Sequence, residues 1–139
     1  MTAKEYLSQA WSIRIRLEAM AEQLEFLKST AQYIVPQYSD MPKPATPNIH
    51  KNEDAIIRVI TYKERMEKQF AKLDEINETI NSVSNPTSQA ILVKRYIGRN
   101  TWDEITSAVY VSRSHAFELH NAALAEIEKL IQKRTVSDG

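Results

Sequence analysis

Hydrophobic positions recur at alternating steps of three and four residues along the first part of the chain, which is the pattern of a long amphipathic helix. In residues 1–35 the series is Ala3, Tyr6, Ala10, Ile13, Leu17, Met20, Leu24, Leu27, Ala31 and Ile34. In residues 51–83 a second series has the same spacing and consists of Ala55, Val59, Tyr62, Met66, Gln69, Leu73, Ile76, Ile80 and Val83. These two heptad seams predict two helices, each on the order of 50 Å long.

Between the seams, residues 36–50 hold four of the five prolines. We expect this proline-rich connector to return the chain antiparallel, so that residues 1–83 form a helical hairpin. The seams can close on each other or on a second copy. Because a narrow two-helix unit rarely stands alone, we expect a homodimer through the N-terminal hairpin.

Cap signals divide the remainder of the chain into three shorter helices. Asn85 and Pro86 are an N-cap and a first helical residue, and this first helix is expected to end at Gly98 in a left-handed cap. A capping box at residues 101–104 begins a second helix of about eight residues. Ser112 caps a third helix that is expected to end near Gln132. The fold class is therefore all-α, with a helix-turn-helix domain at residues 84–134 and an irregular tail at 135–139.

Composition excludes several classes of protein. Two glycines in 139 residues are too few for a sheet-rich fold, a phosphate-binding loop or a dinucleotide fingerprint. With no cysteine there is neither a disulfide framework nor a thiolate metal site, which fits a reducing cytoplasm. No apolar run approaches the ~20 residues of a membrane span, and the first residues do not show the basic region followed by an apolar core that is typical of a signal peptide. We therefore expect a cytoplasmic protein that does not contact membranes.

Specific motifs lie between Arg95 and Leu124. They are Arg95-Tyr96, Thr101-Trp102-Asp103-Glu104-Ile105, Val109-Tyr110-Val111-Ser112-Arg113-Ser114-His115-Ala116, Leu119 and Ala123-Leu124. This stretch resembles region 4 of bacterial sigma factors. With the N-terminal helical pair, the polar linker and Leu119-His120-Asn121-Ala122-Ala123-Leu124, almost the whole chain resembles the ArpU-type phage transcriptional regulators of Gram-positive bacteria. The resemblance implies a bacterial host, promoter DNA as a partner, and control of late or structural phage genes.

One position departs from the usual helix-turn-helix pattern. Many such turns have glycine where this chain has Tyr110. Either Tyr110 adopts a left-handed conformation, or the turn is of a sigma type that does not demand one.

The third helix has two faces at 100° per residue. Its apolar face consists of Ala116, Leu119, Ala123, Ile127 and Leu130, and the opposite face presents Ser114, Glu118 and Asn121, flanked by Phe117 and Arg113. The resemblance puts this second face in the major groove. Arg113 suits a guanine edge or a phosphate, Glu118 suits cytosine N4 and Asn121 suits adenine, while Ser114 is adaptable and Phe117 suits a thymine methyl. The alternatives are a solvated charged face for Arg113 and Glu118, and packing within the domain for Phe117.

A second set of candidates for DNA binding comes from the end of the first short helix. Lys94, Arg95 and Arg99, with Thr101 at the next helix N-terminus, are expected to position phosphates. Lys94, Arg95 and Arg99 can instead compensate the helix C-terminal charge. His115 and His120 project too far apart to form a metal pair, and His120 is expected to be a hydrogen-bonded interior histidine.

Charge limits the affinity of the domain for DNA. The chain has 18 basic and 18 acidic residues, and residues 84–139 carry a net charge of only +1. Because non-specific DNA binding usually takes ~6–10 phosphate contacts, this domain would need a dimer or a larger partner such as RNA polymerase. The alternative function is a protein-interaction module that docks on RNA polymerase or a phage protein without DNA contact. A third possibility is a small, ring-forming DNA-packaging adaptor.

Sequence motifs of enzymes are missing. There is no metalloprotease motif and no cysteine nucleophile, and the neighbours Ser114 and His115 project about 100° apart on a helix. We expect neither catalysis, nor a cofactor, nor a bound metal. The favoured hypothesis is a DNA-binding transcriptional regulator.

Overall fold

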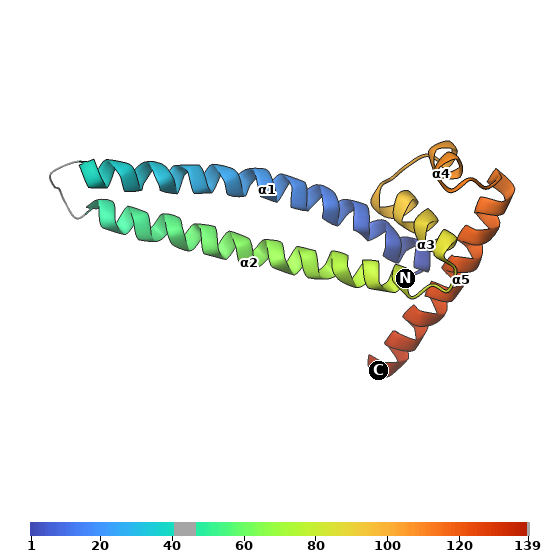
Figure 1. Ribbon diagram of the computed structural model, residues 1–139. Helices are drawn as coiled ribbons and strands as arrows, with labels where there is room; N and C mark the ends of the chain where they lie inside the picture. The colour runs from blue at the N-terminus through green and yellow to red at the C-terminus, as the bar shows by residue number, and fades with distance from the viewer. Residues whose placement is uncertain (41–46, 139) are drawn as a thin grey trace. The chain divides into compact units, whose positions relative to one another are not determined.

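The computed structural model describes residues 1–40 and 47–138, with side chains for residues 1–30 and 53–135. Over these residues the secondary structure is helical, without strands. The elements are α1 (Ala3–Asp40), α2 (Pro47–Asn81), α3 (Pro86–Leu92), the π-helical turn η1 (Val93–Ile97), α4 (Trp102–Val109) and α5 (Arg113–Asp138) (Figure 1). The predicted all-α class, with a long helical pair followed by shorter helices, is confirmed. Within this part of the chain, no helix combines the length and apolar character needed to cross a membrane.

The helices form two compact units. One contains Met1–Arg14 together with Lys72–Gly139, and the other contains Ile15–Ala71. The ends of α1 and α2 that lie near residues 1 and 81 therefore belong to the same unit as α3, α4 and α5, whereas the sequence divides the chain at residue 84.

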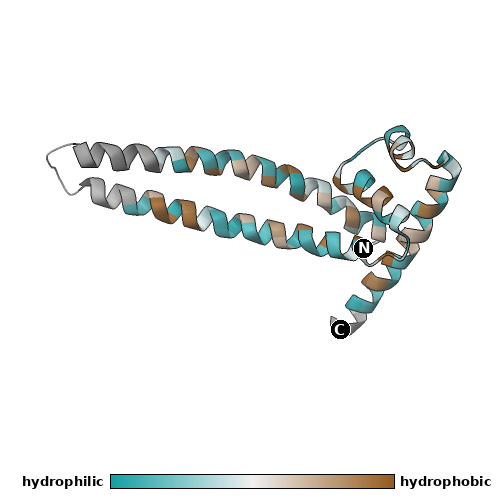
Figure 2. Cartoon of the chain, in the orientation of Figure 1, coloured by the Kyte–Doolittle hydropathy of each residue, from teal (hydrophilic) through white to brown (hydrophobic). Residues whose placement is uncertain are grey.

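In the unit of residues 15–71, α1 and α2 lie side by side and antiparallel (Figure 1). Leu17 is 6% exposed. The remaining described seam positions of this unit are half-buried, and these are Met20, Leu24, Leu27, Ala55, Val59, Tyr62, Met66 and Gln69. Apolar and polar residues alternate along both helices (Figure 2), and the predicted seam is the face that the pair covers. Among the described side chains of this unit, Ile15, Phe26, Ile56, Ile57, Ile60 and Phe70 are large, apolar and exposed, and they lie outside the seam.

Both long helices extend into the predicted connector. Helix α1 continues through Pro36 to Asp40, and α2 begins at Pro47, so these parts of the expected connector 36–50 are helical, and its residues 41–46 lie outside the described residues. Proline fits the first turn of a helix because its missing N–H would have no partner there, which explains Pro47. Pro36 removes one backbone hydrogen bond near the end of a long helix, and α1 extends past it.

The unit of residues 1–14 and 72–139 has a core to which the start of α1 and the end of α2 both contribute. Leu7 and Ile80 are completely buried. Further core positions are Ala3, Ala10 and Ile13 of α1, Ile76 of α2, Val83 just after α2, and Ala116, Ala123 and Ile127 of α5, all at most 9% exposed. The α1 residues are spaced as the first seam predicts. Packing of α1 and α2 against α5 was not predicted.

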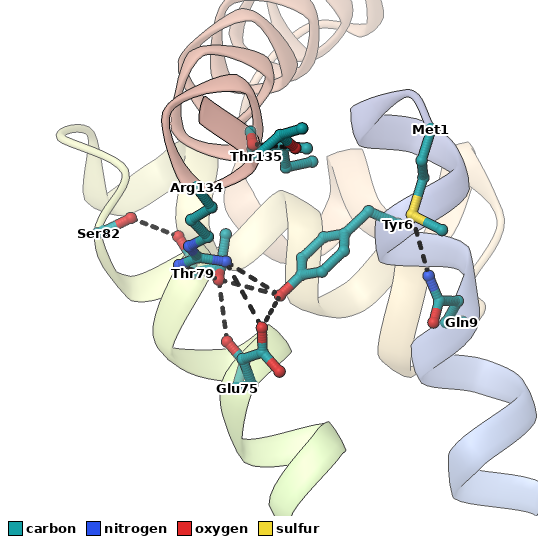
Figure 3. A network of polar contacts seen from close by, with 9 residues as sticks. Met1, Tyr6, Gln9, Glu75, Thr79, Ser82, Arg134 and Thr135 are labelled. Atoms are coloured by element: carbon teal, nitrogen blue, oxygen red, sulfur yellow. Dashed lines mark hydrogen bonds and ion pairs between the residues drawn. The ribbon is translucent and has the colours of Figure 1, made fainter. Parts of the chain in front are cut away.

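A polar network also joins these three helices (Figure 3). Arg134 of α5 donates to the Thr79 hydroxyl at 3.0 Å and pairs with the Glu75 carboxylate at 3.8 Å. The Tyr6 hydroxyl of α1 lies 3.2 Å from the Thr79 Oγ1 and donates to Glu75 Oε1 at 3.5 Å. Since Thr79 is buried, these bonds satisfy a polar group that would otherwise be costly to desolvate.

The predicted N-terminal caps of the short helices are confirmed. The Asn85 side chain accepts from the N–H groups of Thr87 and Ser88 at the start of α3. At α4, Thr101 and Glu104 form both halves of a capping box. At α5 the Ser112 Oγ accepts from the His115 N–H at 3.2 Å. These caps fix where each short helix begins.

The short helices α3 and α4 share a hydrophobic core with α5, and α5 is longer than the sequence predicted. Ile91, Ile105 and Ala116 are fully buried, and Trp102, Val109, Val111 and Leu119 pack around them. Helix α5 continues to Asp138 instead of ending near Gln132, so the prediction of an irregular tail is wrong for residues 135–138. No proline or glycine interrupts the helix before Gly139.

The cap at Gly98 differs from the prediction. Gly98 has φ −82°, whereas Arg99 has φ 54°, so the left-handed residue is Arg99. In η1 the Gly98 N–H donates to the Val93 carbonyl, five residues back, and this wider turn shifts the left-handed position by one residue. A Cβ on Gly98 would lie 3.1 Å from the Lys94 carbonyl oxygen, which favours glycine there for its small size.

The turn before α5 decides between the two alternatives for Tyr110. This residue has φ 57° and ψ 42°, which is the left-handed conformation that glycine adopts at many such turns. Its side chain is 92% exposed. The tyrosine therefore accepts backbone strain of about 1 kcal/mol without compensating packing inside the domain.

Candidate nucleic-acid interface

The N-terminal half of α5 presents an exposed polar face, as predicted. Arg113, Ser114, Glu118 and Asn121 are exposed. On the apolar side Ala116, Ala123 and Ile127 are fully buried, and Leu119 and Leu130 are half-buried. The helix therefore packs through one side and leaves side chains that can contact base edges on the other.

Arg113 is already paired on this face. Its guanidinium donates to Asp103 Oδ1 of α4 at 3.1 Å and lies 5.8 Å from the centre of the Phe117 ring. The pair is exposed, so water screens it and its contribution to stability is small. To bind a guanine or a phosphate, Arg113 would exchange the Asp103 carboxylate for that acceptor.

Phe117 packs inside the domain, which is the alternative stated for it above. Its ring centre lies 4.4 Å from that of Trp102, and the side chain is half-buried. A thymine methyl would contact only the exposed edge of this ring. Glu118 lies 3.6 Å from His115 Nδ1, and this contact is an ion pair only when His115 is protonated.

At the start of α4 the position expected to bind phosphate is already filled. The Thr101 N–H and hydroxyl both donate to Glu104 Oε1, at 3.1 and 3.0 Å. These bonds, the backbone one first, lower the pKa of the Glu104 carboxyl. Because this carboxylate occupies the helix N-terminus, a phosphate at Thr101 would have to displace it.

Arg95 and Arg99 lie near the N-terminal part of α1. Arg95 donates to the Asn100 carbonyl at 3.0 Å, with its guanidinium 5.2 Å from the centre of the Trp102 ring. The Arg99 guanidinium lies 5.5 Å from the centre of the Trp11 ring. Lys94 is half-buried on η1. The two arginines line a hollow together with Lys4 and Trp11, which the sequence did not suggest because they are more than eighty residues away.

Trp102 connects the two groups of candidate residues. Its indole lies against Arg95 of η1 and Phe117 of α5, and is nearly perpendicular to the His120 ring, whose centre is 5.0 Å away. A ligand or substitution that moves this indole would therefore affect both groups.

His120 is the interior, hydrogen-bonded histidine that the sequence predicted. It is 7% exposed, and its Nε2 lies 2.8 Å from the Tyr96 hydroxyl. Burial is the main cause that lowers the pKa of His120, and the positive charges of Lys4 and Arg95 lower it further. The same burial raises the pKa of Tyr96. In the residues that the structure describes, no group of His, Asp or Glu side chains forms a metal site.

The lowered pKa of His120 predicts a pH-dependent stability. Below its ordinary pKa of about 6.5, the unfolded chain binds a proton at this residue while the folded protein resists it. We therefore expect the free energy of unfolding to fall as the pH decreases from 7.5 to 5.5, measured as the midpoint of urea unfolding. His120→Gln should remove most of this decrease, whereas the exposed His115→Gln should retain it. An equal decrease in wild type and His120→Gln would show that other groups cause it.

Comparison with known families adds one finding. The family model described as "protein of unknown function (DUF1492)" matches residues 42–128, which is more than half of the chain. The chain belongs to this family. The match runs from the second half of the hairpin into α5, so the DUF1492 family includes α3, α4 and the N-terminal half of α5. Neither the curated proteins nor the solved structures contain a match.

Proposed function

We propose that this DUF1492 protein is a sequence-specific DNA-binding transcriptional regulator whose helix α5 enters the major groove. The observation that carries the proposal is the arrangement of the two helices at residues 101–121. A capped short helix leads through a left-handed turn at Tyr110 into α5, whose exposed side presents Arg113, Ser114, Glu118 and Asn121. This is the order of a helix-turn-helix reader, in which residues near the start of the second helix contact bases.

The resemblance to ArpU-type regulators extends the proposal to its biological role. It assigns the protein to the cytoplasm of a bacterial host and to the control of phage or prophage late genes. The hairpin supplies the second contact that a weakly charged reader needs, either through a homodimer with two half-sites or through RNA polymerase. Its exposed Ile56, Ile60 and Phe70 offer an apolar surface for such a partner.

A second candidate function is a protein-interaction module that docks on RNA polymerase or a phage protein without touching DNA. The Arg113–Asp103 pair favours it, because Arg113 would first have to leave the Asp103 carboxylate in order to contact DNA. In either case we propose no catalytic activity.

The test begins with selection of bound duplexes from random DNA with the full-length protein, followed by gel-shift titrations. Arg113→Ala should weaken binding to the selected site at least about fivefold, since a bidentate base contact is worth about 1–3 kcal/mol. Ser114→Arg should weaken it as well, because the longer side chain would not fit where the short serine lies against the bases. Lys129→Ala is the matched control for Arg113→Ala, because it removes one exposed charge from the distal part of the same helix.

The outcomes separate the two candidate functions. Affinity that decreases steeply with salt and depends on Arg113 supports DNA reading. Unaltered binding in both α5 variants excludes this helix as the reader. Absence of DNA binding at any salt concentration supports the interaction module instead.

A further inference from the structure

A hollow of about 360 Å³ opens in the unit of residues 1–14 and 72–139. Its lining comes from two segments far apart in the sequence, and consists of Lys4, Ser8, Trp11 and Ser12 of α1 with Arg95, Tyr96 and Arg99. Three of these side chains are cationic and none is a carboxylate. The hollow therefore concentrates positive charge in a protein whose net charge is +0.

Two of the three cations, Arg95 and Arg99, contact aromatic rings, and Arg95 also bonds to a backbone carbonyl. The Arg99 guanidinium lies against Trp11, and Arg95 donates to the Asn100 carbonyl. Arg14 lies 5.5 Å from the centre of the same Trp11 ring and donates to the Ile97 carbonyl, which ties α1 to the end of η1. Lys4 Nζ forms neither an ion pair nor a hydrogen bond with the part of the chain that the structure describes. Its charge is free to bind an anion.

The charges converge closely enough to affect a neighbouring group. Burial lowers the pKa of His120 most, and both Lys4 and Arg95 lower it further, so both charges lie near this ring. Like charges repel one another more strongly in a partly enclosed site than in bulk water. An anion in the hollow would relieve this repulsion and stabilise the folded protein.

The backbone on one side of the hollow is unusual in two respects. Arg95 and Tyr96 belong to the π-helical turn η1, and such turns occur frequently at functional sites. Arg99 has a left-handed backbone that glycine or asparagine would adopt more easily. Arg99 therefore places a cationic side chain at a position whose backbone conformation is strained for any residue with a Cβ.

We propose that this hollow binds a small molecule that carries a phosphate or diphosphate group. Lysine and arginine donors match the two or more negative charges of such a group, and the Ser12 hydroxyl supplies a further polar contact. The volume lies at the small end of the range for small-molecule sites. Phosphates of a DNA backbone have the same chemistry, but a hollow favours a small ligand because the phosphates of a duplex lie on a convex surface.

The experiment titrates the full-length protein with inorganic pyrophosphate at constant ionic strength, set with potassium chloride. Binding is measured by the change in tryptophan fluorescence, since Trp11 lines the hollow, and by the rise in melting temperature. We expect saturable binding with a rise in Tm, and an affinity at least fivefold lower for Lys4→Gln. Arg99→Asn removes a second charge while keeping a residue that tolerates the left-handed backbone, and should weaken binding similarly. Lys129→Gln is the matched control and should bind pyrophosphate as the wild type does.

The results that would overturn the proposal are specific. A rise in Tm that chloride reproduces, or equal pyrophosphate affinity in wild type, Lys4→Gln and Arg99→Asn, excludes the hollow as a phosphate site. No pyrophosphate binding, combined with weaker binding of a mixed-sequence duplex by Lys4→Gln than by Lys129→Gln, identifies the DNA backbone as the source of phosphate. Failure of DNA binding by itself contradicts only the proposed function, because pyrophosphate binding is measured without DNA.

Discussion

Replacing Trp102 with alanine should lower the free energy of unfolding by about 3 kcal/mol, measured by urea denaturation of the full-length protein. The indole contacts Phe117, His120 and Arg95, and it packs on the cluster of Ile91, Ile105 and Ala116. Its removal leaves a cavity between α4, α5 and η1, which these helices can close only by shifting.

The same substitution should abolish specific DNA binding if α5 is the reader, because Phe117 would lose the ring that holds it beside Arg113. Trp102→Phe keeps an aromatic face toward Phe117 and Arg95, and should recover most of the lost stability. A Trp102→Ala protein as stable as the wild type would contradict the central position of this indole. A stable protein that still binds its DNA site with wild-type affinity would separate Trp102 from DNA reading.

Local signals in the sequence predicted much of the fold. The heptad spacing identified the buried face of both long helices, including the half-buried Gln69. Caps at Asn85, Thr101 and Ser112 identified where the short helices begin, because each depends on contacts within three residues. The exposed face of α5 followed from helical periodicity alone.

Contacts between distant segments could not be predicted in this way. The Ala3 N–H donates to the Glu128 carboxylate, and Arg134 bonds to Thr79, yet neither pair leaves a pattern in the local sequence. The hollow likewise requires Lys4 and Trp11 to meet Arg95 and Arg99. The π-helical turn also shifted the left-handed residue from Gly98 to Arg99, a change of one position that cap signals do not reveal. The candidate residues were therefore predicted both on α5 and at the end of the first short helix, but the hollow that Lys4 and Trp11 complete beside η1 was not.

Because the start of α1 and the end of α2 share a core with the short helices, a C-terminal fragment without them should not fold by itself. Residues 84–139, the domain that the sequence delimits, should show no cooperative thermal transition by circular dichroism. The fragment lacks the core positions that precede residue 84, which are Ala3, Leu7, Ala10, Ile13, Ile76, Ile80 and Val83. Fully burying one large aliphatic side chain is worth about 1.5–3 kcal/mol, so the loss of Leu7, Ile13, Ile76, Ile80 and Val83 is comparable to the whole ~5–15 kcal/mol by which a domain is usually stable.

Point substitutions in the full-length chain test the same packing without truncation. Leu7→Ala should lower the free energy of unfolding by about 2–4 kcal/mol, because Leu7 is 0% exposed, and should destabilise the short helices with it. Phe26→Ala is the matched control in the same helix, where the side chain is 66% exposed, and should change stability by less than about 0.5 kcal/mol. If residues 84–139 instead melt cooperatively at the temperature of the full chain, the cluster around Ile105 is sufficient for folding. The end of α1 would then contribute to the hollow without supporting the helix-turn-helix core.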